Sequence, residues 1–540
     1  MLGAELSMFV LNAVLLTAVV APLVLWRYRR AVLAGMMDRP GTTLVPPQAQ
    51  PKPPAPPAAV PSAAPPAVPS AAQWQARVQR RVFWAVFGVV FVCALPLSLL
   101  FVWLGDLPRT PAHVYLKAGV LATLAVPMAT VLVGWMLRRA LGLWLATLLA
   151  MALAGVVLSM LQRPFFGRAP SLDQLYNAVV FLQLAAVTLP VPLLLLLASG
   201  ARRVRGVAPI VLAALLVFGL APLVGLRLTT WLTGTQGGAR WVLAGPGLDT
   251  GFVLLALPVG LLAWWRLKRV ARAYEAKRFS DAQLLLRTWW LLVVAVEAVD
   301  LVNAHADAVL PVLATAALAV AAFRPLLDAA LRRALAVPGR PPPRTLLVLR
   351  VFGDTARSEA LFDRLVARWR WFGPVTMIAA PDVVARTVDP GDFLRFATGD
   401  IATSFVTTQD DLQRRLATLD TTPDPDGRYR VNEFCCRDSS WQATVVQLIE
   451  RADAVVMDLR GYGPQRAGCE YELGELGRRR RAEQVLLLVD DSTDQARLDA
   501  QLGPLRPPRL QLPRHDARAT AAAFDALLQA AGLAARGTAA

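Results

Sequence analysis

The residues best suited to chemistry lie in the stretch AVVMDLRGYGPQRAGCEYELGEL, residues 454–476. An apolar run of strand length stops at a turn that contains Asp458 and Arg460, and a charged helical pattern follows with Cys469 and Glu472. A thiolate or a carboxylate in such a place can act as a nucleophile. An Asp and an Arg two residues apart can equally form a local ion pair at the end of the strand, which is the simpler interpretation of Asp458 and Arg460.

Cysteine chemistry is disfavoured in this chain. No histidine is near Cys469, and the C-terminal part contains only His515, so we expect Cys469 to be a small packed residue. The four cysteines fit neither a zinc-ligand spacing nor a disulfide framework, and we expect reduced thiols and no metal site. The four are Cys93, Cys435, Cys436 and Cys469.

The glycines between 461 and 468 do not form a known phosphate-binding loop. In GYGPQRAG the third glycine comes too late for the dinucleotide fingerprint, and the Lys-Ser/Thr pair of a P-loop is missing. No hydrolase triad is recognisable either.

Apolar runs of strand length alternate with helical patterns from residue 345 onward. This alternation predicts a parallel sheet covered by helices on both faces, in a domain of 345–540 that is large enough for its own core. The strands are predicted at TLLVLRVF, VTMIAA, DAVVMDL and EQVLLLVDD, and the helices at RSEALFDRLVARWRWFG, SSWQATVVQLIERA, GCEYELGELGRRRRA and ARATAAAFDALLQAAG.

Ligands of parallel sheets gather outside the carboxyl ends of the strands. Here those ends open the loops RVFGDTARSE, after the first strand, and DLRGYGPQRAG, after the strand at 453–459. We therefore expect the two loops to form the site together.

Two stretches resemble the Toll/interleukin-receptor (TIR) family. VLRVFGDTARSEALFDRL is similar to the box that opens TIR domains, above all the plant form, where a strand runs into a Gly-Glu-Asp-Thr-Arg turn and a helix. ADAVVMDLRGYGPQRAGCEYEL resembles the later segment with a Trp-Cys-x-x-Glu-Leu motif, of which Cys469, Glu472 and Leu473 are present. The same ELG is similar to the nucleoside deoxyribosyltransferases, whose nucleophilic glutamate occupies this position. The resemblance implies a flavodoxin-like α/β fold over 345–540.

The resemblance also implies a chemistry. In these families the glutamate acts at an anomeric carbon, where a carboxylate stabilises the oxocarbenium character of the ribose or forms an ester. Glu472 would take this role on NAD or a related nucleotide, as a substrate and not a cofactor. Phe352, Gly353 and Asp354 would shape the pocket, Asp458, Arg460 and Cys469 would border it, and Arg460 would pair with pyrophosphate.

Two departures from the family pattern favour a different interpretation. Gly468 stands where the motif has Trp, and 381–432 enlarges the region after the second strand. Glu472 could then belong to a solvated helix face on which Glu475 pairs with the arginines that follow it.

The first two-thirds of the chain is apolar: 56% of all 540 residues are hydrophobic and 17% are charged. Runs of about 20 apolar residues have the length needed to cross a bilayer, so we expect an α-helical polytopic membrane domain. The nine predicted spans are 6–26, 82–104, 114–136, 141–161, 176–198, 207–225, 250–266, 284–303 and 307–323.

Charge indicates the orientation. Arginines and lysines follow the first span as RYRR and cluster in every alternate loop, which predicts an N-terminus outside and a C-terminal domain in the cytoplasm, in the inner membrane of a bacterium. The net charge of +18 belongs to the membrane half, because 345–540 is near charge balance. It indicates contact with anionic lipid and not with nucleic acid.

The predicted domains follow from these patterns: 1–30 is an anchor helix, 77–324 the polytopic membrane domain, and 345–540 the cytoplasmic domain. A Pro- and Ala-rich linker of 31–76 is expected to be extended. A juxtamembrane helix and linker occupy 325–344.

Glu297 and Asp300 lie on one helical face in the eighth predicted span, where carboxylates are expensive and often functional. They indicate proton or cation handling, unless water or a neighbour such as Lys117 satisfies them at the outer interface.

Two functions of different classes follow. The first is a membrane-anchored signalling or defence protein whose TIR-like domain hydrolyses NAD or a related nucleotide after self-association. The second is an inactive TIR-like interaction module on a membrane sensor. A transporter with a regulatory domain ranks third, since few other charges in the predicted spans suggest a path.

Overall fold

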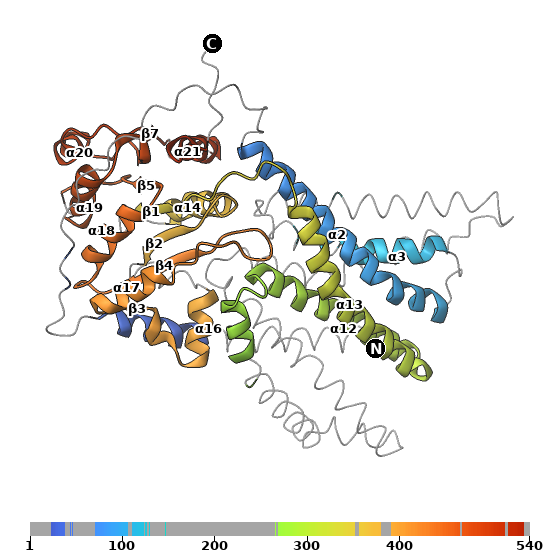
Figure 1. The fold of residues 1–540 in the computed structure, drawn as a ribbon. Helices are drawn as coiled ribbons and strands as arrows, with labels where there is room; N and C mark the ends of the chain where they lie inside the picture. The colour runs from blue at the N-terminus through green and yellow to red at the C-terminus, as the bar shows by residue number, and fades with distance from the viewer. Residues whose placement is uncertain are drawn as a thin grey trace, which may run out of the picture. The chain divides into compact units, whose positions relative to one another are not determined.

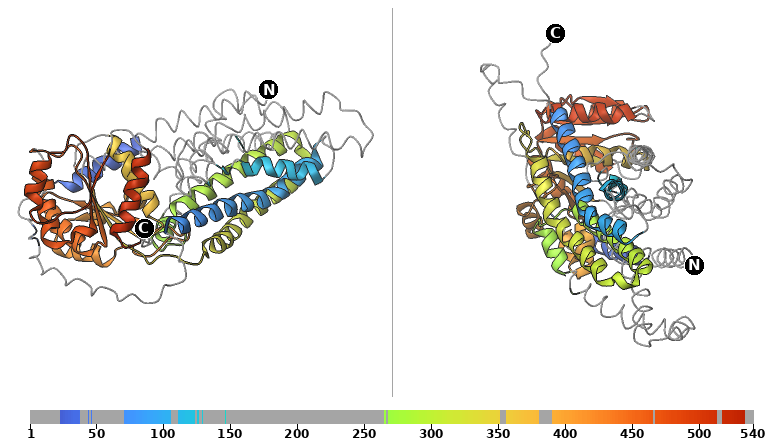
Figure 2. Two further views of the ribbon diagram at one scale, coloured as in Figure 1. Left: turned by 90° about the horizontal axis from the view of Figure 1, so that it is seen from above. Right: turned by 90° about the vertical axis from the view of Figure 1, so that its right-hand side faces the viewer.

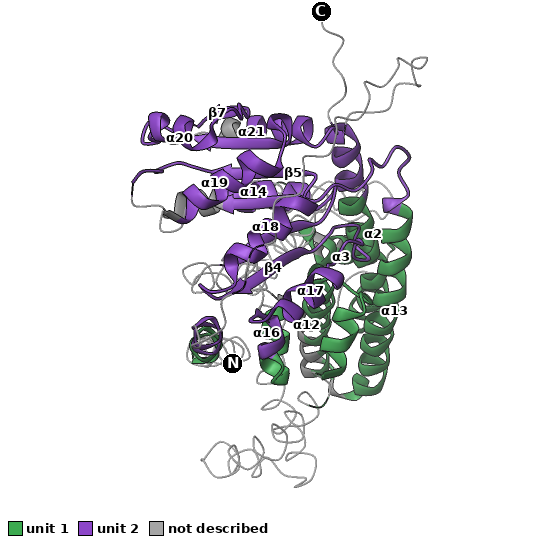
Figure 3. Ribbon diagram, turned by 60° about the vertical axis from the view of Figure 1, so that its left-hand side comes forward, with its two compact units in different colours: residues 1–29, 82–333, 387–400 green, residues 30–81, 334–386, 401–540 purple. Residues whose placement is uncertain are grey.

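The chain divides into two compact units in the computed structural model (Figure 3). Unit 1 consists of residues 1–29, 82–333 and 387–400, and unit 2 of residues 30–81, 334–386 and 401–540. The structure describes residues 23–37, 71–105, 111–123, 268–350, 356–379, 390–464, 467–512 and 517–533, with single residues 44, 46, 125, 126, 129, 146 and 265.

A seven-stranded sheet forms the centre of unit 2 (Figure 1), and every neighbouring pair of strands in it is parallel. The strand order is β3-β4-β2-β1-β5-β6-β7. The strands are β1 (Leu346–Arg350), β2 (Val375–Ala379), β3 (Phe405–Val406), β4 (Val431–Cys436), β5 (Ala454–Asp458), β6 (Val485–Val489) and β7 (Arg509–Gln511).

Helices flank the sheet on both faces (Figure 2). α14 packs against α21 on one side, while α19 packs against both α18 and α20 on the other. This agrees with the predicted α/β class and with the apolar strands, of which β5 and β6 are buried throughout. The helices are α14 (Ala356–Trp369), α17 (Gln409–Ala417), α18 (Trp441–Arg451), α19 (Ala467–Arg479), α20 (Gln495–Leu502) and α21 (Ala517–Ala530), with 3₁₀ turns η2 (Ile401–Ser404) and η3 (Ala482–Gln484).

The direction of the chain reverses at β1. From β1 the chain moves to β2 on one side, and it later returns to β5 on the other, with Arg350 directly opposite Asp458. Such a switch point leaves a crevice outside the carboxyl ends of the two strands. The carboxyl ends of β1 and β5, from which the two predicted loops start, thus lie side by side, while residues 351–355 of the first loop lie outside the described residues.

All eight strands and helices predicted after residue 345 are present, within a few residues at their ends. The region 381–432, which was expected only to enlarge the segment after β2, contributes further elements: α16 (Pro390–Thr398), β3, α17 and the first residues of β4. β4 pairs with β2, and β3 adds the next strand, so the region widens the sheet beyond β2.

Nine membrane spans are not supported. Two described helices, α2 (Ala71–Leu104) and α13 (Val309–Leu335), are long and apolar enough to cross a bilayer. The predicted eighth span is α12 (Asp281–Ala304), which carries four ionisable side chains and is not among these two helices. α3 (Pro111–Thr123) covers part of the third, and the remaining predicted spans lie wholly or largely outside the described residues. A membrane location therefore stays a prediction.

α12 and α13 form a helical hairpin in unit 1, joined by the 3₁₀ turn η1 (Ala306–Ala308). The Trp290 indole N–H donates to the Ala319 carbonyl at 3.1 Å, and Arg287 pairs with Asp328 at 2.7 Å. α13 continues through Pro325 to Leu335, so the predicted juxtamembrane helix is the end of a longer helix and not a separate element.

The predicted linker of 31–76 also ends earlier than expected, because α2 begins at Ala71. Trp74 is 2% exposed and donates to the Val337 carbonyl at 3.4 Å, while Gln75 donates to the Arg368 carbonyl at 3.1 Å. The first turns of α2 are thus part of the packed interior of unit 2.

Candidate functional site

Glu472 lies in the second turn of α19, the helix that follows β5. Its side chain is 2% exposed, and no described residue forms a hydrogen bond with its Oε2 atom. Burial raises the pKa of this carboxyl to about 8, because removal from water penalises the charged form. The solvated, salt-bridged face that was the alternative for this residue is therefore wrong for Glu472.

The salt bridges of that alternative are present on the next turn of α19, but on a buried face, since Glu475 is 4% exposed. The Glu475 carboxylate pairs with Arg478 and, at 2.7 Å, with Arg479. Arg479 also pairs with Glu450 of α18. Two buried glutamates three residues apart on one helix thus differ, because among the described residues Glu475 has ion-pair partners and Glu472 has none.

The helix geometry explains the burial of Glu472. Gly468 and Glu472 lie one turn apart, hence on the same face of α19. A Cβ atom at Gly468 would lie 3.9 Å from Cη2 of Trp441, the first residue of α18. The Trp441 ring also packs edge-on against Tyr471, with centroids 5.4 Å apart. A tryptophan from the neighbouring helix therefore covers the α19 face beside Gly468, where the motif tryptophan is missing.

Asp458 and Arg460 form the predicted local ion pair. Arg460 donates from Nε to Oδ1 and from Nη2 to Oδ2 of Asp458, both at 2.8 Å, and Asp458 is 3% exposed. The backbone N–H of Arg460 donates to the same carboxylate at 3.2 Å. This bidentate ion pair fixes the turn at the carboxyl end of β5.

Cys469 is packed in the hydrophobic core with Leu473 and Leu476, as the simpler interpretation expected. Among the described residues, no group of three or more His, Cys, Asp or Glu side chains could hold a metal ion. Phe352, Gly353 and Asp354, the predicted pocket residues after β1, lie outside the described residues.

In unit 1, Glu297 is 8% exposed and pairs with Lys117, whose Nζ lies 2.9 Å from Oε2. Lys117 is 4% exposed and lies over the Phe101 ring, 4.3 Å from its centroid. Lys117 is the neighbour that was expected to satisfy this carboxylate. The Asp300 side chain lies outside the described part of α12.

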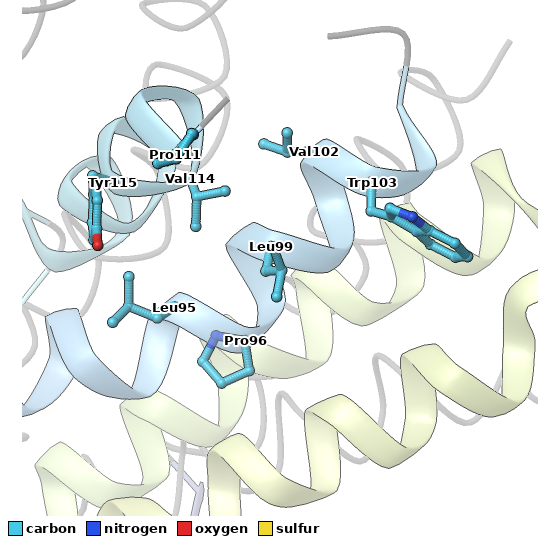
Figure 4. Close-up of a pocket in the computed structure, with 8 residues that line it drawn as sticks. All are labelled: Leu95, Pro96, Leu99, Val102, Trp103, Pro111, Val114 and Tyr115. Carbon is cyan, nitrogen blue, oxygen red and sulfur yellow. The ribbon is translucent and has the colours of Figure 1, made fainter. Parts of the chain in front are cut away.

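An apolar groove of about 520 Å³ lies between α2 and α3 in unit 1 (Figure 4). Its described lining holds no carboxylate, thiol or basic side chain, and its one ionisable group is the phenol of Tyr115. The lining residues are Leu95, Pro96, Leu99, Val102, Trp103, Pro111, Val114 and Tyr115.

Trp441 and Tyr471 are the residues beside Glu472 that the sequence did not single out. Trp441 follows the Ser-Ser pair that precedes α18. This pair indicates where a helix starts, but it does not predict that Trp441 contacts α19. Its proximity to Gly468 depends on the packing of α18 against α19, which periodicity does not reveal.

The chain matches no protein-family model, no curated protein and no solved structure. The class of the candidate site therefore depends on the geometry above and on the sequence resemblance.

Proposed function

We propose that unit 2 is a TIR-like domain that hydrolyses the N-glycosidic bond of NAD or a related nucleotide, with Glu472 as the catalytic carboxylate. The observation that carries this proposal is the buried carboxyl of Glu472, without a described hydrogen-bond partner for Oε2, on the helix after β5. A buried acid without a partner is destabilising, and groups with strongly perturbed pKa values concentrate at functional sites.

The strand order supports the finer fold class. Without β3 and β4, the strand order is β2-β1-β5-β6-β7. Renumbered along the chain, these five strands have the order 2-1-3-4-5 of flavodoxin-like folds. Ligands of such folds bind at the switch point beside the first strand. β1 and β5 are the strands at that point, and eight residues separate the end of β5 from the start of the helix with Glu472.

The proposed reaction breaks the bond between the ribose C1′ and the nicotinamide nitrogen. Positive charge passes from the pyridinium ring to the ribose as the bond lengthens, and the nitrogen keeps the bonding electron pair. A nearby positive charge favours the ionised form of a carboxyl, so the bound substrate would lower the pKa of Glu472 and let its carboxylate stabilise the oxocarbenium ion. Water then adds at C1′ and loses a proton, giving ADP-ribose.

The other predicted residues take supporting roles in this proposal. Phe352, Gly353 and Asp354 would shape the pocket from the β1 side. Arg460 is held by Asp458 and would contact pyrophosphate only with the outer part of its guanidinium. Cys469 would shape the pocket by packing alone.

We further propose that the chain is anchored in a bacterial inner membrane, with unit 2 in the cytoplasm. α2 and α13 have spanning length, and both expose large apolar side chains, among them Trp84, Leu99 and Trp103 on α2 and Leu310 and Leu318 on α13. Exposed apolar faces of this kind suit contact with lipid. Self-association of unit 2 and the absence of nucleic-acid partners are part of this proposal.

A second function, an inactive interaction module, is favoured by two observations. Trp441 covers the α19 face on which Glu472 lies, and Arg460 is already engaged by Asp458. The third function, a transporter, is disfavoured because Glu297 is neutralised by Lys117.

NAD turnover tests the first function directly. The full-length protein is the right material, since residues 30–81 belong to unit 2 and a fragment of 345–540 lacks Trp74 and Gln75. Nicotinamide release should occur with wild-type protein, diluted or clustered through a tag, and disappear in Glu472→Gln. Glu475→Gln, on the same helix, should retain it. Inert wild-type protein in both states would assign unit 2 to the interaction class.

A further inference from the structure

Glu472 is buried on a face of α19 that adjoins the amino end of α18. The carboxyl is 2% exposed, and Trp441 lies against Gly468 and Tyr471 on the adjoining surface of α19. Trp441 is the first residue of α18, so movement of the amino end of that helix would carry the ring away from this surface of α19. The contacts that hold this end therefore fix the position of the ring.

Several hydrogen bonds hold the amino end of α18, among them the following three. The Ser440 hydroxyl donates to the Val406 carbonyl at 2.7 Å and accepts from the Arg437 backbone N–H at 3.0 Å. The third involves a residue distant in sequence: the Leu44 backbone N–H donates to the Ser439 carbonyl at 2.9 Å. The Leu44 side chain is half-buried and packs against the core of unit 2.

A second contact from the N-terminal segment reaches the same place. Arg437 Nε donates to the Gly35 carbonyl at 3.1 Å. Gly35 lies so close to Phe405 of β3 that a Cβ atom on it would be 2.4 Å from Cε2 of the ring. Gly35 and Leu44 are thus fixed to residues that lie within four positions of Trp441 or on the neighbouring strand.

We propose that the contacts of Gly35 and Leu44, called here the latch, hold Trp441 closed over Glu472, and that release of the latch admits the nucleotide. This inference rests on the proposed function, since it regulates the same site. The closed state is autoinhibited, because Gly35 and Leu44 of the protein's own N-terminal segment hold the amino end of α18.

The latch also connects the site with a source of displacement. Gly35 lies in the helix of residues 23–36, whose first residues belong to the first predicted membrane span. A shift of that helix pulls directly on the Gly35 carbonyl and on Arg437. A stimulus would raise the activity only to the extent that it binds the released state more tightly than the closed state.

Gly35→Val in the full-length protein tests the latch, because no space exists for a side chain between residue 35 and the Phe405 ring. Leu44→Asp is the second variant, and it replaces the packed side chain with a charge. Gly88→Val is the matched control, since Gly88 is a helical glycine with nothing within 4 Å of its Cβ position. Each is compared by hydrogen exchange of residues 439–448 and by NAD turnover.

We expect both latch variants to exchange faster over 439–448 and to turn NAD over about tenfold faster, as loss of a few contacts shifts a closed population by that order. The control should match wild type, and adding Glu472→Gln should abolish the gain. Unchanged exchange and turnover in both latch variants would overturn the latch. The latch would also be overturned if the latch variants exchanged hydrogen faster over 439–448 but hydrolysed NAD at the wild-type rate. If no protein hydrolyses NAD, the proposed function fails, and exchange alone then decides whether the latch holds α18.

Discussion

Replacing Glu472 by glutamine should change how stability depends on pH. Burial raises the pKa of this carboxyl from 4.5 to about 8, so between those values the folded protein retains a proton that the unfolded chain has released. Stability therefore falls as the pH rises from about 4.5 through 8. Glutamine does not ionise, and the Glu472→Gln variant should lose this part of the pH dependence.

The size of the effect follows from the shift. At 1.36 kcal/mol per pKa unit, full ionisation of Glu472 costs about 5 kcal/mol, of which roughly 3 to 4 kcal/mol falls between pH 5 and pH 8. For a domain the size of unit 2, each kcal/mol moves the unfolding midpoint by about 2–4 °C. The midpoint of wild-type protein should thus fall by roughly 7 °C or more relative to that of Glu472→Gln over this range.

Thermal unfolding followed by tryptophan fluorescence at half-unit steps from pH 5 to pH 8.5 measures this difference. Any fixed cost of burying the glutamine amide shifts the whole curve and leaves its slope unaffected. Glu475→Gln is the control, because it breaks an ion pair with Arg479 at both ends of the range and should keep the wild-type slope. Parallel curves for wild type and Glu472→Gln would refute a buried carboxyl with a raised pKa.

Three further predictions concern stability and binding. Trp74→Ala should destabilise unit 2 by about 3–5 kcal/mol in urea unfolding, because the indole is 2% exposed and its N–H is bonded. Lys117→Met or Glu297→Leu alone should each lower the free energy of unfolding by about 3–5 kcal/mol, because each leaves a buried charge without its partner. The double variant should recover most of this stability, measured by thermal midpoints of the purified protein. Arg460→Ala should cost about 1–3 kcal/mol in urea, since buried Asp458 loses its partner, while KM for NAD changes by less than about threefold.

Local patterns were sufficient for most of the sheet. β1, β5 and β6 are apolar runs of strand length between turn signals, and a parallel sheet that is buried on both faces requires such runs. β4 was missed because its first half, with Asn432 and Glu433, is only partly buried. β3 has two residues, too few for any periodicity. The pairing of β4 with β2 and of β3 with β4 depends on contacts between distant segments, which periodicity does not encode.

The composition of residues 31–76 led to a wrong prediction, because part of the expected extended linker is packed. Residues 31–76 are rich in Pro and Ala and predict an extended spacer. Yet Trp74 and Gln75 lie in α2 and form hydrogen bonds with other residues of unit 2. Gly35 and Leu44 also form contacts inside this unit. A single tryptophan at the end of a segment without other aromatic residues was the signal.

Glu472 shows why a helical pattern alone cannot separate a catalytic carboxyl from a surface charge. The spacing of Glu472, Glu475 and Arg479 fits one stripe, and the structure places that stripe against α18 and not in solvent. Within the stripe, Glu475 and Arg479 neutralise one another, whereas no described residue forms an ion pair with Glu472. The distinction depends on whether a cation lies within reach, and this is a property of packing.

The same burial links the two proposed functions as states of one domain. With a pKa of about 8, Glu472 is mostly neutral at pH 7, and a neutral carboxyl cannot stabilise an oxocarbenium ion. The proposed closed state of unit 2 would therefore be inactive and would act only through its surface. Opening would admit water and a cationic pyridinium, and both favour ionisation, so access and activation of the carboxyl would occur in one step. Whether the released protein turns over NAD therefore separates an inhibited hydrolase from an interaction module, since the closed state has the same properties in both.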